Sequence, residues 1–147
     1  MSEAEDDRAL RALQRQREFA QESAEARLRQ ARTRIAALEA TLRDIETQRR
    51  AQAPLSADLR WSAQAVRYMA MLAERTAAAR AQHEQAVQDM EAVRGEWLAC
   101  RRAVETVAAL LRVAEVRRRR AAQRAAEREA DAAWLAVRRH GQAEAEG

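Results

Sequence analysis

Residues 28–45 of the chain read LRQARTRIAALEATLRDI. Apolar residues recur in this stretch at alternating spacings of three and four, at Leu28, Ala31, Ile35, Leu38, Leu42 and Ile45. This spacing places them in one row along a helix, and it is the a and d pattern of a coiled coil. A helix buries so narrow a row only against another helix. The stretch therefore predicts a long helix that needs a partner.

The composition predicts that the partner is also a helix. The 147 residues include three Gly and one Pro, and aromatic residues make up 3% of the chain. Few turns can be built from so little Gly and Pro, and a chain rich in Ala, Arg, Glu and Leu favours helices over strands. We expect an all-α fold, namely a two-helix antiparallel coiled-coil hairpin whose second helix is the longer.

Local signals predict where the helices begin and end. Ser2 and Glu5 have the spacing of a capping box, Pro54 and Ser56 indicate a break, and Gly141 follows basic residues as a helix terminator. We expect one hairpin over residues 1–147. Its parts would be a first helix at about 3–52, a turn at 53–56, a second helix at about 57–140 and a tail at 141–147.

A turn at 53–56 would place the N-terminus beside residue 106 or so. Residues 112–139 would then project beyond the first helix. The larger apolar residues of the second helix change phase near Arg94, so we expect the apolar stripe to drift there, with a bend permitted by Gly95. The stripe comprises Val66, Met69, Val87, Met90, Trp97, Val104, Val107 and Leu111.

The sequence contains no set of residues typical of a catalytic or cofactor site. It has no Gly-rich phosphate loop, and Cys100, His83 and His140 are too few and too far apart for a zinc site. We expect no enzyme activity, no cofactor and no metal. The chain lacks an apolar run long enough to span a bilayer and begins with the acidic MSEAEDD, which predicts a cytoplasmic protein without membrane insertion.

All 27 basic residues are Arg, and the net charge is +4. Arg suits bidentate recognition of carboxylates and phosphates, but an Ala- and Arg-rich chain without Lys is also what a GC-rich genome encodes. Acidic residues lie among the arginines, and no stacking aromatic lies within the Arg run. We therefore expect no nucleic-acid binding, although a basic nucleic-acid-binding coiled coil remains an alternative, as does a homo-oligomeric scaffold.

Two surfaces are candidates for binding proteins. The first follows the turn, where Trp61, Tyr68 and Met71 cannot all face one partner helix; packing at the hairpin tip is the other interpretation. The second is the projecting end of the second helix. Its candidate residues are Arg117, Arg118, Arg119, Arg120, Arg124, Arg128, Trp134 and Leu135.

The projecting end carries a resemblance to a known family. Residues 117–139, RRRRAAQRAAEREADAAWLAVRR, combine an Arg run, a Glu- and Arg-rich segment and an acidic and aromatic ending. This pattern resembles the FliJ/YscO family, the coiled-coil stalk proteins of flagellar and virulence type III secretion. Ala130 and Ala132 stand where that ending commonly has longer polar residues.

The resemblance implies a non-enzymatic stalk at the base of the secretion apparatus, on the cytoplasmic side of the inner membrane. The joined N- and C-terminal end, including Arg117 to Arg120, Arg124, Arg128, Trp134 and Leu135, would bind the hexameric export ATPase. The surface of Trp61, Tyr68 and Met71 would contact the export gate protein or secretion chaperones.

Overall fold

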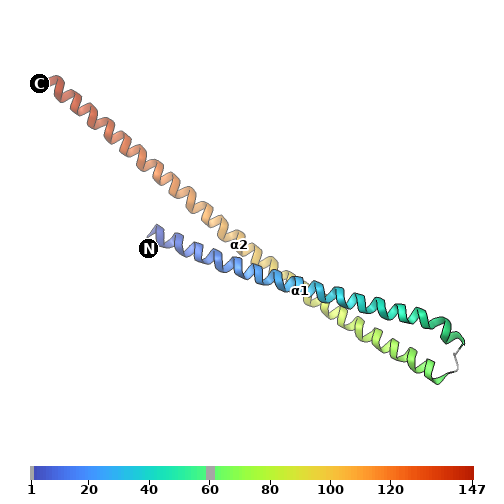
Figure 1. The fold of residues 1–147 in the computed structure, drawn as a ribbon. Coiled ribbons are helices and arrows are strands. Elements are labelled where there is room, and N and C mark those ends of the chain that lie inside the picture. The colour runs from blue at the N-terminus through green and yellow to red at the C-terminus, as the bar shows by residue number, and fades with distance from the viewer. Residues whose placement is uncertain (1, 59–61) are drawn as a thin grey trace. The chain divides into compact units, whose positions relative to one another are not determined.

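The computed structural model describes residues 2–58 and 62–147, without the side chains of residues 54–58. These residues form two α-helices, α1 at Glu3–Asp58 and α2 at Ala63–Glu146 (Figure 1). The predicted all-α fold with a longer second helix is confirmed. No helix in the described ranges has an apolar stretch long enough to cross a membrane.

The beginning of α1 follows the predicted capping box. The Ser2 backbone N–H donates to Glu5 Oε2 at 3.1 Å, and the Glu5 backbone N–H donates to Ser2 Oγ at 3.3 Å. Each side chain thus satisfies a backbone donor that the first turn leaves without a helical partner. Glu3, Glu5 and Asp6 also place negative charge at the positive end of the helix dipole.

The later helix ends differ from those expected. Residues 53–56, the expected turn, lie within α1, which ends at Asp58, and α2 begins at Ala63 instead of about residue 57. Pro54 has no N–H for the helical ladder, but this removes one hydrogen bond and does not by itself reverse a chain. α2 also runs through Gly141 to Glu146, because Gly141 does not take the positive φ of a glycine terminator.

The chain divides into two compact units. Unit 1 comprises residues 1–16 and 103–147, and unit 2 comprises residues 17–102. Both helices contribute to each unit. In unit 2, residues 17–58 of α1 and residues 63–102 of α2 pack against each other with opposite chain directions.

The predicted seam of α1 is confirmed in unit 2. Every position of the 28–45 row is buried or half-buried, and the row extends back to Ala24 and Gln21. A cluster of Ile45, Leu72 and Ala79 forms its centre, with Leu42, Tyr68 and Met69 packed against it. Ala24, Ala79 and Ala86 are among the buried hydrophobic residues, so the seam is thin and buries little apolar area per turn.

The seam of α2 does not drift near Arg94 as the sequence suggested. Its buried and half-buried positions keep the alternation of three and four through Gly95, which does not mark a change of phase. Val66, expected in the stripe, is 60% exposed. The expectation failed because it followed large side chains, whereas several seam positions are occupied by small ones. In unit 2 the row is Ala65, Met69, Leu72, Thr76, Ala79, His83, Ala86, Met90, Val93, Trp97 and Cys100.

Polar contacts across the seam of unit 2 fix how the helices are aligned. Arg27 Nη1 lies 2.6 Å from Glu96 Oε2, and Arg34 Nη1 lies 3.8 Å from Asp89 Oδ2. His83 lies on the seam, with Nε2 at 3.3 Å from Glu39 Oε1. The two Arg pairs are about half exposed, so each contributes about 0–1 kcal/mol and specifies register more than stability.

The seam predicts how mutations in unit 2 affect stability. Leu72 is 1% exposed, so Leu72→Ala should lower the free energy of unfolding by about 2–5 kcal/mol. Val66→Ala removes a mostly exposed side chain and should change it by less than about 0.5 kcal/mol. Urea unfolding followed by circular dichroism measures both. Equal effects of the two substitutions would show that the assigned seam is wrong.

Candidate protein-binding site

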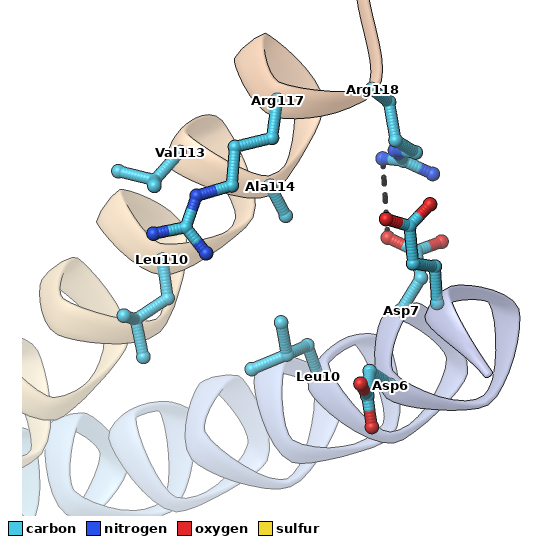
Figure 2. Close-up of a pocket in the computed structure, with 9 residues that line it drawn as sticks. Asp6, Asp7, Leu10, Leu110, Val113, Ala114, Arg117 and Arg118 are labelled. Atoms are coloured by element: carbon cyan, nitrogen blue, oxygen red, sulfur yellow. Dashed lines mark ion pairs between the residues drawn. The ribbon is translucent and has the colours of Figure 1, made fainter. Parts of the chain in front are cut away.

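The first turns of α1 are held to α2 in unit 1 by an ion pair. Arg118 Nη2 lies 3.2 Å from Asp7 Oδ1 (Figure 2). Arg118 also pairs with Glu115 at 2.8 Å, and Asp7 also pairs with Arg11 at 2.9 Å. Asp7 Oδ1 and Arg118 Nε are nevertheless buried without a hydrogen-bond partner among the described residues. The two side chains therefore attract each other by charge, but these two atoms make no hydrogen bond.

This contact corrects the predicted alignment of the helices. The sequence placed the N-terminus beside residue 106 or so, whereas Asp7 meets Arg118. The chain reverses later than expected. In a hairpin the numbers of facing residues have a constant sum, so moving the reversal by one residue shifts the facing residue on α2 by two. Residues 112–121, expected to project freely, therefore lie alongside α1, and Ala114, Arg118 and Ala121 are half-buried.

A cavity of about 330 Å³ lies between the helices at this point. Leu10 of α1 faces Leu110 and Val113 of α2 across it (Figure 2). Leu110 and Val113 are about half exposed. Acidic side chains of α1 and basic side chains of α2 form its rim: Glu3, Asp6, Asp7, Arg117 and Arg118.

Residues 122–146 of α2, which we call the C-terminal segment, pack against no other part of the described chain. Every residue in this range is exposed, whereas Ala121 is the last half-buried one. The segment is roughly 40 Å long at 1.5 Å per residue. The predicted projecting helix is thus present, but it begins at residue 122, ten residues later than the expected residue 112.

The C-terminal segment ends in exposed apolar side chains. Trp134 is 59% exposed, Leu135 46% and Val137 72%. The Arg138 guanidinium lies 5.2 Å from the centre of the Trp134 ring, a cation–π contact that keeps a positive charge beside the indole. Three large apolar side chains within four residues of a solvent-exposed helix favour contact with another macromolecule.

The structure divides the candidate arginines into two groups. Arg118 and Arg119 pair with Glu115 next to α1, so Arg118 stabilises the hairpin itself. The others are exposed and make no ion pair with any described carboxylate, while Arg128 Nε donates to the Arg124 carbonyl oxygen at 3.3 Å. Arg117, Arg120, Arg124 and Arg128 are the ones available to a partner.

The second candidate surface is only partly described. Trp61 lies outside the described residues. Tyr68 is half-buried and packs against the Ile45, Leu72 and Ala79 cluster. Met71 is 42% exposed. The described part therefore brings Tyr68 to the seam and leaves Met71 at the surface.

Sequence reasoning missed two features of the surface. Phe19 is 73% exposed on α1, and Leu110 and Val113 line the cavity of unit 1. The cavity was hidden by the wrong alignment, since the expected turn put α1 beside earlier residues of α2. Phe19 falls outside the α1 row, and that spacing was the signal that could have found it. Within the described ranges, no group of three or more His, Cys, Asp or Glu residues is arranged to hold a metal ion.

Comparison with known proteins gives no family assignment: no protein-family model, no curated protein and no solved structure matches the chain.

Hydrogen exchange tests the division between seam and C-terminal segment. A helix segment that packs against nothing frays and opens locally, whereas a packed helix opens with the unit that holds it. In the dilute, monomeric chain, we expect backbone amides of residues 125–146 to exchange at least about 100-fold faster than those around Leu72. Peptide-resolved mass spectrometry measures this, and equal protection in the two regions would show that something covers the segment in the free chain.

Proposed function

We propose that the chain is the non-enzymatic central stalk of a type III secretion export apparatus. In this proposal the C-terminal segment and the adjoining end of unit 1 bind the hexameric export ATPase. The protein would act in the cytoplasm, at the base of the apparatus and peripheral to the inner membrane. The resemblance of residues 117–139 to the FliJ/YscO family is the source of this proposal.

One observation carries it: α2 continues for residues 122–146 as an unpacked helix that ends in exposed Trp134, Leu135 and Val137. An exposed helix gains little stability from such residues, since apolar area stabilises only when it is removed from water. Insertion into an apolar collar of a ring would bury them. Trp is also the side chain that most often dominates the binding energy of an interface.

The arginines suit the rim of such a contact. Arg117, Arg120, Arg124 and Arg128 are exposed, and their spacing of three and four residues places them along one side of α2. A ring of subunits presents equivalent carboxylates in several directions, so a row of arginines on one side of the helix can meet those of any subunit it faces. Their individual contributions should be smaller than that of a buried tryptophan.

The other end of the stalk would contact the export gate protein or secretion chaperones. Met71 is the exposed described member of that surface. Tyr68 supports it from the seam, where it packs against the core cluster. The proposed contact is therefore centred on Met71 and on Trp61, and Tyr68 has a positioning role.

Point variants of the full chain test the proposed ATPase contact. Trp134→Ala and Leu135→Ala should each weaken binding to the cognate export ATPase by about 2 kcal/mol or more, roughly 30-fold, and reduce stimulation of ATP turnover. Phe19→Ala is the matched control, because Phe19 is at least as exposed but lies on α1 in unit 2. Surface plasmon resonance and a phosphate-release assay measure the two effects.

If both C-terminal variants bind and stimulate the ATPase as well as the Phe19→Ala variant does, the C-terminal segment is not the ATPase-binding element. Circular dichroism should show unchanged helicity in all three variants, since each replaces an exposed residue with Ala, the strongest helix former.

A further inference from the structure

A second row of side chains runs along α2 beside the seam. It alternates by three and four residues, as the seam does, but it lies on the flank of the helix. Its members are Leu110, Val113, Arg117, Arg120, Arg124, Glu127, Asp131 and Trp134, and all of them are exposed. We call these residues the flank row.

The flank row changes chemical character along the helix in a definite order. Leu110 and Val113 are apolar, the next three residues are basic, Glu127 and Asp131 are acidic, and Trp134 is apolar again. A parallel pair of such rows would place like charges opposite each other. In an antiparallel pair centred on Arg124, Val113 faces Trp134 at both ends, and Arg117 and Arg120 face Asp131 and Glu127. Only the two copies of Arg124 then face a like charge.

We propose that two copies of this chain associate antiparallel through the flank rows of α2. The Leu110 and Val113 end of each copy would lie beside the Trp134 end of the other. Arg117 would lie beside Asp131 and Arg120 beside Glu127, with the two copies of Arg124 at the centre of the pair. This inference does not depend on the proposed secretion function, because it requires only a second copy.

The cavity in unit 1 is the part of the surface that a second copy would fill. Its walls are apolar where Leu10, Leu110 and Val113 meet, and its rim carries Glu3 and Asp6. Trp134 of the second copy would enter the cavity together with Arg138, whose guanidinium lies 5.2 Å from the centre of the Trp134 ring. The indole therefore matches the apolar walls, and the guanidinium matches the acidic rim. Two such contacts form in a symmetric pair, one at each end.

Self-association would have a consequence for the C-terminal segment. Trp134 would be covered in the pair and exposed in the single chain. Any partner that uses Trp134 must then compete with the second copy, so association would hold the segment inactive until such a partner is present.

Sedimentation equilibrium of the full chain alone tests the proposal, over a wide concentration range at low and high salt. The intact chain should form dimers that dissociate as salt increases. Trp134→Ala should weaken dimerisation about tenfold or more. Val137→Ala is the matched control, since Val137 lies in the same segment, is 72% exposed and falls outside the flank row.

Charge-reversal variants test the antiparallel order. One variant carries Arg117→Glu, Arg120→Glu and Arg124→Glu, and the other carries Glu127→Arg and Asp131→Arg. Each row then has one sign of charge, so neither variant should dimerise alone, whereas an equimolar mixture should form heterodimers. These measurements contain no ATPase, so their outcome is separate from that of the proposed function.

Three outcomes would overturn the inference: a chain that stays monomeric at all concentrations, dimers that Trp134→Ala leaves as tight as Val137→Ala does, or charge-reversed variants that dimerise alone as well as the intact chain. Circular dichroism of each variant should give the helicity of the intact chain, since every changed residue is exposed.

Discussion

The spacing of small and apolar residues along two helices determines nearly everything else in this chain. Alternation of three and four residues gives each helix a single buried row, so α1 and α2 can pack only along one line. Alanine occupies many positions of that line, which brings the helices together but buries little area. Stability therefore depends on few residues, such as Leu72 and Ile45. Polar pairs at the edges, such as Arg27 with Glu96, select one alignment over its neighbours.

Features that depend on interactions within one or two helical turns were predicted correctly from the sequence. The capping box of Ser2 and Glu5 is a local hydrogen-bonding arrangement and needs no tertiary context. The α1 row at 28–45 was equally clear, because its large residues mark both positions of the repeat. The hairpin and its longer second helix followed from these signals and from the scarcity of Gly and Pro.

Features that depend on tertiary packing were predicted less well. Pro54 and Ser56 favour a break, yet α1 runs to Asp58, and the delayed reversal changed the partner of every α1 residue. Arg118, assigned to a free helix, instead pairs with Asp7. In α2 the seam positions at 79, 86 and 114 are alanine, so larger flanking residues suggested a drift that is absent. For the candidate site, the sequence correctly indicated that Trp134 and Leu135 are exposed. The cavity beside Leu110 could not be predicted, because it depends on which residues of α1 face α2.

Beyond the boundary of the seam, α2 exposes a surface of unusual chemistry. Up to Ala121, α2 is covered in part by α1, and beyond it the same helix carries arginines, carboxylates and a tryptophan with no intramolecular partner. The central claim is that this C-terminal segment is the recognition element. The most direct test compares hydrogen exchange of the chain alone and in complex with the cognate hexameric export ATPase. The account predicts strong new protection confined to about residues 117–146, with unit 2 unchanged. Protection in unit 2 with none in the C-terminal segment would contradict it.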